Sequence, residues 1–590
     1  MRDVIVIGAG GGGPIVAKEL AQRGLNVLML EAGARNADPE QAWTHFENDS
    51  NNPISGTKRW GPSDRTKQNW SRELPKPASI LNVSGIGGTT QMYFGNSPRA
   101  MPGVFAGYSG SDASQYDRDY EFPFSYEELR PYYEWVETTL PVQTAAMGSS
   151  EQTFFTGCEN IGMSVQTTKD ITGDSFRPQE NAVLQPGGNA GLTTNKTALE
   201  YPNATGCTFC GHCQQGCYQP RLAPRNLKAR RSTDNSYVPM ALTADLWSTN
   251  GQAVSIETDA YVTQIHTETV NGEEVAKGVT WRNNTTGETF YEEAEVVVMA
   301  AGCVENPRLW LNSGLPNTND WVGRGLTDHA LDFVVGKFPY HTGGAKGVGS
   351  SARADFPTKG CIEPATMGPA FMAGTMMFSD SGIRGQYDNG RGEFGAWDGP
   401  SGRIVGKDLR NLLEDVNNTL TMLILTDDDV EASNQVSVSA DTDDEHGAIA
   451  RVDMNKRDRT QRTLDNREFL ANKAAEILRA AGATEVIRVD AVPILLHVQS
   501  SMRMGSDPSN SVLDENAEAR SVKKLFVADN SALANALGGP NPTLTTQALA
   551  TRTAEKIYQQ YFGGSAWVGV ETPLSSIDDS VTNAVITRGL

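Results

Sequence analysis

The stretch Asp3-Val4-Ile5-Val6-Ile7-Gly8-Ala9-Gly10-Gly11-Gly12-Gly13 decides the fold of this chain. Its apolar, β-branched half predicts a buried strand, and the glycine run carries the spacing G-x-G-x-x-G at Gly8, Gly10 and Gly13. Residues 14–23 then show the apolar periodicity of a helix, and residues 26–30 form a second apolar run. The sequence therefore predicts a βαβ unit over residues 3–31.

This unit is typical of a dinucleotide-binding site. The glycines let the backbone approach a pyrophosphate, and the helix N-terminus offers N–H groups and the positive end of its dipole. Glu31 follows the second strand, where its carboxylate can accept a hydrogen bond from a ribose hydroxyl. These residues alone do not separate NAD from FAD, and a structural glycine-rich turn is the alternative.

Length and charge bound the other possibilities. The 590 residues are enough for two large lobes. A net charge of −21 disfavours nucleic acid and anionic membranes as partners. No apolar run approaches the ~18 residues of a membrane helix, so we expect no direct membrane insertion. Because the nucleotide-binding strand begins at Asp3, we expect no signal peptide of its own, which leaves the cytoplasm or export by another protein.

A second glycine-rich block spans residues 83–99. Its glycine density would let the backbone lie flat against a large planar ligand; a mobile loop is the alternative. The polar stretch between the two blocks, with a predicted loop at 50–53, is a candidate lid over a nucleotide.

Further along the chain, periodicity predicts several elements and two acidic turns. Strands are expected at 295–302, 419–426 and 434–439, and helices at 126–137, 305–311, 467–481 and 542–558. The acidic groups 427–429 and 441–445 are interpreted as solvated turns, with a calcium site as the alternative.

Four of the seven cysteines lie close together. Cys207, Cys210, Cys213 and Cys217 have the spacing C-x2-C-x2-C-x3-C, which is typical of thiolates that wrap one small iron–sulfur cluster. A structural zinc site and free thiols are the alternatives. Nearby basic residues either offset the negative charge of a cluster or form an ordinary solvated face; they are Arg221, Arg225, Lys228, Arg230 and Arg231.

Four blocks, at 8–31, 87–99, 299–329 and 497–550, resemble those of the glucose–methanol–choline (GMC) oxidoreductases, which bind FAD. The resemblance implies an α/β (α+β, two-lobe) fold. A discontinuous Rossmann-like FAD-binding domain is expected at 1–100, 200–330 and 491–563, with the cysteine segment at 206–218. A substrate domain on a mainly antiparallel sheet is expected at 101–199 and 331–490, and a tail or arm at 564–590.

The resemblance also implies site residues. His497 matches the catalytic histidine of the family, and Asn541 matches its paired position. A neutral imidazole can take a hydroxyl proton as a hydride leaves for the flavin N5, while an amide orients the hydroxyl without competing for the proton. The N-terminus of the helix after Pro542 can stabilise negative charge on the flavin pyrimidine. The expected cofactor contacts are Gly8, Gly10, Gly13, Glu31, Gly87, Gly88, Thr89, Met92, Val262, Ala301, Asp529, Asn530, Asn541, Pro542 and Thr543.

Two departures refine this expectation. Some sugar oxidases of the family link FAD through a histidine whose place is Met92 here, so we expect non-covalent FAD. Cys207, Cys213 and Cys217 look like the three-cysteine set of the bacterial FAD-dependent glucose and glucoside dehydrogenases, which carry [3Fe–4S]. Cys210 is additional and as a fourth ligand would allow [4Fe–4S].

The first hypothesis is a dehydrogenase that oxidises a sugar or glycoside hydroxyl and passes electrons through the cluster to a protein acceptor, a cytochrome c. Relatives of this kind pair with a small chaperone-like subunit that carries the export signal, which implies a periplasmic location. The second hypothesis is an oxidase that uses O2, with the cysteines binding zinc or nothing. The third is a flavin protein kept for binding, without turnover.

Overall fold

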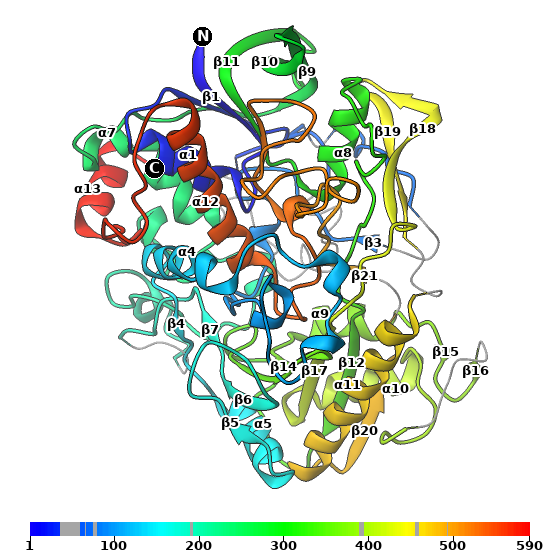
Figure 1. Cartoon of the computed structure of the whole chain (residues 1–590). Helices are drawn as coiled ribbons and strands as arrows, with labels where there is room; N and C mark the ends of the chain where they lie inside the picture. The colour runs from blue at the N-terminus through cyan, green and yellow to red at the C-terminus, as the bar shows by residue number, and fades with distance from the viewer. Residues whose placement is uncertain are drawn as a thin grey trace.

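Two sheets organise the molecule, each at the centre of one lobe (Figure 1). This computed structural model describes residues 1–35, 60–64, 66–74, 79–188, 193–388, 395–454, 459–491 and 494–590. The predicted loop at 50–53, and with it most of the candidate lid, lies outside the described residues.

The first sheet has seven strands in the order β8-β2-β1-β11-β10-β9, and β22 also pairs with β11. β1 (Arg2–Ile7) lies between β2 (Val27–Leu30) and β11 (Thr289–Met299), and all three run parallel. β22 (Leu525–Val527) is parallel to β11 on the other side. The remaining strands are β8 (Ser255–Glu257), β9 (Ala260–Val270) and β10 (Glu273–Asn283).

The register makes the parallel strands end together. Ile7 pairs with both Leu30 and Met299, and Met299 pairs with Val527. The loops that follow these four strands therefore emerge at one edge of the sheet, which is where ligands bind in open parallel sheets.

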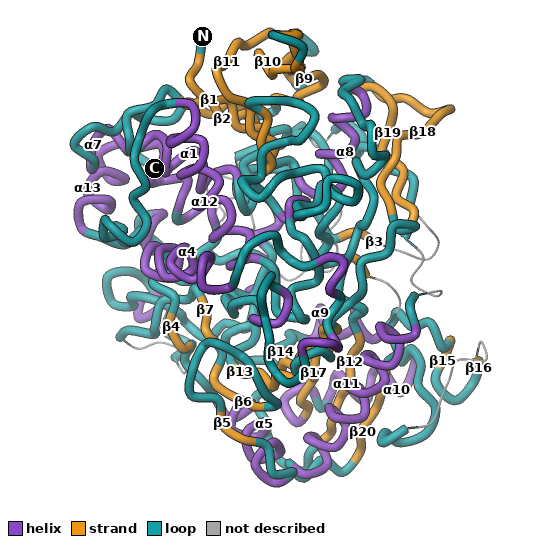
Figure 2. Tube along the Cα trace, viewed as in Figure 1, coloured by secondary structure: helices purple, strands orange, loops and turns teal. Residues whose placement is uncertain are grey.

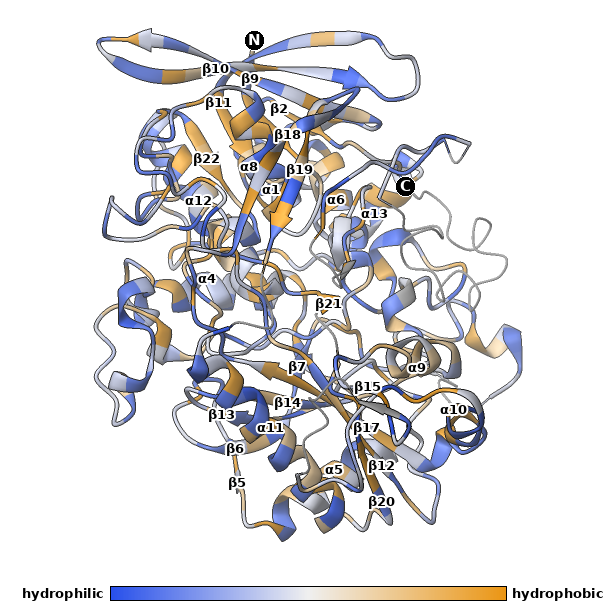
Figure 3. Ribbon diagram, turned by 90° about the vertical axis from the view of Figure 1, so that its right-hand side faces the viewer, coloured by the Kyte–Doolittle hydropathy of each residue, from blue (hydrophilic) through white to orange (hydrophobic). Residues whose placement is uncertain are grey.

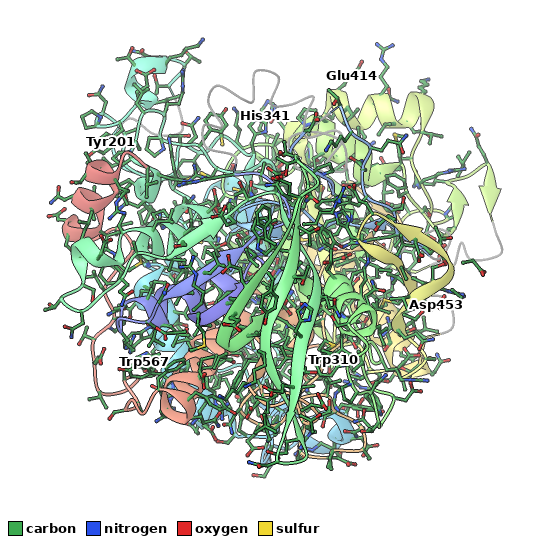
Figure 4. The ribbon with its side chains drawn as sticks, turned by 90° about the horizontal axis from the view of Figure 1, so that it is seen from above. Tyr201, Trp310, His341, Glu414, Asp453 and Trp567 are labelled. Carbon is green, nitrogen blue, oxygen red and sulfur yellow. The ribbon has the colours of Figure 1, made fainter. Side chains whose placement is uncertain are left out.

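Helices pack against both this sheet and each other. α1 (Gly13–Ala21) is buried along its whole length, because α12 (Thr543–Tyr561) and α6 (Tyr237–Leu242) cover it. α8 (Gly302–Asn312) carries the fully buried Trp310 and lies beside β9 in the view from above (Figure 4). Also in this lobe are α4 (Tyr126–Thr139), α7 (Ala244–Trp247) and α13 (Asp579–Arg588).

The second sheet has the order β20-β12-β17-β14-β13-β6-β5 and is antiparallel except between β5 and β6. α11 and α5 cover one face, and an apolar cluster with α9 and α10 covers the other, so β17 is buried at every residue. Its centre, residues 422–425, is a continuous apolar run. The strands of this sheet are largely coloured as apolar in Figure 3.

The bounds of these strands are β5 (Ser164–Val165), β6 (Ser175–Pro178), β12 (Asp332–Lys337), β13 (Ala352–Phe356), β14 (Gly360–Ala365), β17 (Thr419–Thr426) and β20 (Glu485–Arg488). The helices are α5 (Ser149–Asn160), α9 (Pro369–Met376), α10 (Gly406–Glu414) and α11 (Gln461–Ala480). Short pairs are β3 (Ser79–Ile80) with β21 (Ile494–Leu495), β4 (Gln143–Thr144) with β7 (Glu180–Asn181), and β15 (Gly382–Ile383) with β16 (Tyr387–Asp388).

Two segments expected in the substrate domain pack elsewhere. Aromatic side chains between residues 105 and 135 join the core of the first lobe, where α4 contacts α12. The hairpin of β18 (Gln435–Asp444) and β19 (Gly447–Asp453) packs on α8. Long loops connect these elements, as the tube in Figure 2 shows, so sequence adjacency is a poor guide to lobe membership here.

The prediction of a solvated turn at 427–429 is wrong. Asp427 and Asp428 are buried, because Arg462 and Arg459 reach back from the region of α11 to pair with them. The group 441–445 is largely exposed, as predicted, but its first four residues lie in β18 rather than in a turn, and Asp444 pairs with the buried Arg308. Within the described ranges, no group of three or more His, Cys, Asp or Glu side chains is arranged to hold a metal ion.

The segment 564–590 is a packed arm. Trp567 is buried against Tyr558, and α13 places Val581 and Val585 against Met240. Among the helices of the described residues, none is long and apolar enough to cross a membrane.

Candidate active site

A cavity of about 260 Å³ lies at the carboxyl edge of the first sheet and extends to Leu423 on β17 of the second. Most residues predicted to contact a cofactor line it. They are Gly8, Gly10, Glu31, Gly88, Thr89, Met92, Val262, Ala301, Asp529, Asn530, Asn541, Pro542 and Thr543. Both predicted catalytic residues, His497 and Asn541, line the same cavity.

Two of the predicted contacts, Gly13 and Gly87, do not line the cavity. Both are instead packed closely against other parts of the protein. A Cβ at Gly13 would lie 2.0 Å from the Gly8 carbonyl oxygen, so only glycine lets the helix start this close to the loop. Gly87 has φ +94° and abuts Asp234, which a side chain would displace.

Gly10 and Gly12 differ sharply in their surroundings. A Cβ at Gly12 would lie 1.7 Å from the Ala528 carbonyl oxygen, whereas a Cβ at Gly10 would meet no protein atom within 4 Å. Gly12 is therefore required for packing of the loop on the segment that follows β22. Gly10 instead leaves open space in the cavity wall, as a closely approaching pyrophosphate requires.

The Glu31 carboxylate has a role that the sequence did not show. Its Oε2 accepts a hydrogen bond from the Ala9 N–H (2.8 Å), and its Oε1 accepts from the N–H groups of Gly33 and Gly85 (2.9 Å each). Burial raises the pKa of Glu31, while these three donors lower it. Glu31 thus ties the first glycine loop to the second glycine-rich block, and it also lines the cavity.

Asp529, which also lines the cavity, joins two further segments of its wall, and we call the loops held by Glu31 and Asp529 the dinucleotide cradle. Its Oδ2 accepts from the Gly302 N–H (2.7 Å) and from Asn306 Nδ2 (2.8 Å), and its Oδ1 accepts from Ser531. It joins the start of α8 to the loop after β22. Asn306 is a site-building residue that sequence reasoning missed.

His497 is held by the turn at the end of the third sequence block. Its backbone N–H donates to Asp328 Oδ1 (2.7 Å), while Thr327 and Gln499 exchange backbone hydrogen bonds of 2.9 and 2.8 Å. His329 lies beyond, fully buried, with its Nδ1 2.9 Å from His497 Nδ1. Sequence reasoning missed His329, because a single histidine in a loop carries no local pattern.

A buried carboxyl lies under Asn541. Glu363 on β14 accepts from Asn96 Nδ2 (2.7 Å), lies 3.5 Å from Arg353, and has the Asn541 side chain as a hydrogen-bonding neighbour. Desolvation raises the pKa of Glu363 to about 7 despite these partners. The only sequence signal for it was a charged residue inside an otherwise apolar strand. Asn541 Oδ1 itself is buried and has no hydrogen-bond partner among the described residues.

The four clustered cysteines surround a second, small cavity of about 20 Å³. Backbone N–H groups of Phe209, Gly349 and Arg230 point at the sulfurs of Cys207, Cys213 and Cys217, at 3.3–3.4 Å. Burial, with the charge of neighbouring thiols, raises the pKa of Cys210 to about 12. Because no described group converges closely enough to hold a metal ion, the iron–sulfur cluster stays a prediction.

Two side chains that line the large cavity also lie close to the clustered cysteines in packing or in sequence. Phe94 lines the large cavity and packs against the apolar cluster that contains Cys207 and Cys213. Gln214, the neighbour of Cys213 in the chain, also lines the large cavity.

The interpretation of the basic residues after the cysteines as a solvated face is wrong for two of the five. Arg230 and Arg231 are fully buried. Arg230 donates to the carbonyl oxygens of Thr90 and Gln91 at 2.5 and 2.8 Å, so it braces the second glycine block.

Comparison with known proteins places this site in a family. Two family models, both described as GMC oxidoreductase, match residues 172–331 and 430–550. The chain belongs to the GMC oxidoreductases. It is 26% identical to the 2-methyl-1,2-propanediol dehydrogenase of Mycolicibacterium austroafricanum, over 95% of each chain. It is 24% identical to the fructose dehydrogenase large subunit of Gluconobacter japonicus, over 94% of this chain and 97% of that protein.

Paromamine 6′-oxidase of Streptomyces fradiae is 23% identical, over 94% of this chain and 91% of that protein. Among solved structures, a variant of the formate oxidase of Aspergillus oryzae matches with a TM-score of 0.59 and 13% identity, over 95% of this chain and 99% of that one. The shared fold is that of a flavoprotein.

The cavity of this GMC oxidoreductase fits FAD. The open space beside Gly10 would admit the pyrophosphate, and Glu31 on the same wall would lie toward the ribose. The start of α12, with Pro542 and Thr543, lines the same cavity as His497. Asn541, with its unpartnered amide oxygen, lines it as well. Met92 lines the cavity and offers no nitrogen for a covalent link to the flavin.

We predict that Gly10→Ala and Gly12→Ala separate cofactor binding from folding. Gly10→Ala should leave the thermal midpoint of the FAD-free protein unchanged and weaken FAD binding by about tenfold or more, since its methyl group fills the pyrophosphate space. Gly12→Ala should lower the free energy of unfolding by about 1–3 kcal/mol, because a backbone carbonyl cannot swing away. Calorimetry and FAD titration measure both; equal behaviour of the two variants contradicts the assignment.

We predict that Glu363 makes stability fall as pH rises from 4.5 to about 7. In this window the carboxyl is protonated when folded and ionised when unfolded, so unfolding releases a proton and higher pH favours it. Glu363→Gln should remove this part of the slope, measured by denaturant unfolding across the window. Glu414→Gln, at an exposed position on α10 (Figure 4), is the matched control and should keep the wild-type slope. An unchanged slope in Glu363→Gln counts against the burial argument.

Proposed function

We propose that this protein oxidises a hydroxyl group of a sugar or glycoside, with His497 as the base that takes the hydroxyl proton and Asn541 as the residue that orients the hydroxyl. The observation that carries the proposal is that these two residues, from different loops, line one cavity with the dinucleotide cradle. The names of the relatives support it, since they include a dehydrogenase of fructose and an oxidase of paromamine.

The chain's own residues supply binding and proton transfer. FAD, when bound, supplies the two-electron acceptor for the hydride from the carbinol carbon. His497 in its neutral form accepts the proton that leaves the hydroxyl oxygen, so that the carbonyl product forms as the C–H bond breaks. Leu423 and Phe371 from the second lobe add apolar surface to the cavity wall.

We further propose that Cys207, Cys210, Cys213 and Cys217 hold an iron–sulfur cluster, [3Fe–4S] or [4Fe–4S], which would supply one-electron transfer to a cytochrome c. Three backbone N–H groups aimed at the sulfurs support it, because such donors stabilise thiolate ligands. Phe94, which lines the large cavity and also packs on the apolar cluster with Cys207 and Cys213, supports a relay. A small chaperone-like subunit with an export signal, and hence a periplasmic location, belongs to the same proposal.

The alternative is an oxidase that passes electrons to O2, with zinc or nothing at the cysteines. The name of one relative, paromamine 6′-oxidase, supports this alternative. Oxygen uptake, set against reduction of a dye or of cytochrome c, separates the two.

We predict that His497→Ala slows anaerobic bleaching of the flavin by sugar about 10²–10⁴-fold while FAD content stays at the wild-type level, because the base is lost and the cradle is not. Stopped-flow absorbance measures the rate. His341→Ala, at an exposed position (Figure 4) that does not line the cavity, is the control and should react like wild type. Undiminished bleaching in His497→Ala would support a flavin protein whose binding function needs no base.

We predict iron and acid-labile sulfide in anaerobically purified protein, together with a broad visible absorption beneath the flavin bands. Cys213→Ser should lose both iron and electron transfer to cytochrome c, but keep flavin reduction by sugar. Cys210→Ser should keep a cluster if its nuclearity is [3Fe–4S]. Zinc in stoichiometric amount without sulfide would refute the cluster.

A further inference from the structure

A second histidine, His329, contacts the proposed base, His497. The other hydrogen-bond partners of His329 determine which of the two rings donates in this contact. His329 Nε2 lies 3.1 Å from the Ala536 carbonyl oxygen. A carbonyl oxygen only accepts, so His329 Nε2 carries the hydrogen. The Gln499 amide lies 3.4 Å from the same nitrogen, and its Oε1 has no partner among the described residues. With that amide turned over, Oε1 also accepts from His329 Nε2–H.

His329 is neutral in the folded protein. It is fully buried, and desolvation lowers its pKa although the carboxylates of Asp428, Asp328 and Asp427 act in the opposite direction. A neutral imidazole with hydrogen on Nε2 has a bare Nδ1, which can only accept.

The contact of 2.9 Å between the two Nδ1 atoms then has one direction. Since His329 Nδ1 accepts, His497 Nδ1 must donate. We propose that His329 is a positioning residue that holds His497 as the Nδ1–H tautomer, which leaves His497 Nε2 as the nitrogen that accepts the substrate proton. The effect of this tautomer on catalysis rests on the proposed function, whereas the assignment of the tautomer rests on the hydrogen bonds alone.

The same chain of hydrogen bonds determines where the proton can go. When the substrate O–H bond breaks, its proton goes to His497 Nε2 and the electron pair of the C–H bond leaves with the hydride. The resulting imidazolium still donates through Nδ1 to neutral His329, which stabilises it. His329 cannot pass a proton onward, because its other nitrogen already donates to a carbonyl. The proton therefore leaves by the cavity.

The backbone holds the pair in this geometry. Asp328 accepts a hydrogen bond from the His497 N–H, and two backbone hydrogen bonds between Thr327 and Gln499 join the two chain segments beside it. The rings meet nearly edge to face, at an interplanar angle of 77° with centroids 4.9 Å apart. A side chain that replaced His329 would therefore change the hydrogen bond with little movement of the His497 backbone.

The experiment uses the FAD-loaded full-length protein with ¹⁵N-labelled histidine. The seven histidines are few enough for the ring-nitrogen signals to be assigned, and His497→Gln identifies the signal of interest. We expect His497 as the Nδ1–H tautomer in the wild type, and a shift toward the Nε2–H tautomer in His329→Leu. An Nε2–H tautomer in the wild type would overturn the proposal.

Kinetics provide the second readout. We expect His329→Leu to lower kcat about 10–100-fold with KM little changed and FAD retained, as for loss of an orienting partner of a functional histidine. His329→Asn, whose amide oxygen can replace Nδ1 as an acceptor, should recover most of the rate, and His341→Leu should match wild type. Equal loss in the Leu and Asn variants would overturn the positioning role. If no sugar is oxidised but the Nδ1–H tautomer is observed, the proposed function fails and the tautomer assignment stands.

Discussion

The parallel register of β1, β2, β11 and β22 is the constraint on which the site depends. Because Ile7, Leu30, Met299 and Val527 are paired in one line, the loops that follow them emerge side by side. Two buried carboxylates then join these loops: Glu31 binds backbone N–H groups of two glycine-rich segments, and Asp529 binds the start of α8. The cradle is thus preorganised by the protein itself before any cofactor enters.

The catalytic end depends on a different kind of contact. His497 and Asn541 lie on segments without regular structure, and buried side chains contact both of them. Asp328 holds the His497 backbone, His329 contacts its ring, and Glu363 lies beneath Asn541. Burial lowers the pKa of His329 and raises that of Glu363. Such perturbation is typical of sites where protons move.

Although the chain has a net charge of −21, several arginines are buried and hold parts of the structure together. Arg230 braces the second glycine block, and Arg459 and Arg462 neutralise the buried Asp427 and Asp428. These pairs are shielded from solvent, so removing one partner would leave an uncompensated buried charge. Arg230 also presents its backbone N–H to Cys217. One residue thus contacts both the thiol cavity and the wall of the cofactor cavity.

The sequence by itself determined what local patterns encode. These are the βαβ unit and its glycines, the cysteine spacing, the periodic helices α11 and α12, and, through four blocks, the family and a set of cofactor contacts, nearly all of which line the cavity. Only the tertiary structure decided which residues act behind the site. The charge run at 427–429 resembles a solvated turn until Arg459 and Arg462 are brought to it, and His329 has no significance until a turn sets it 2.9 Å from His497. Periodicity reports the local environment of a segment, whereas the state of a buried polar group depends on partners distant in the chain.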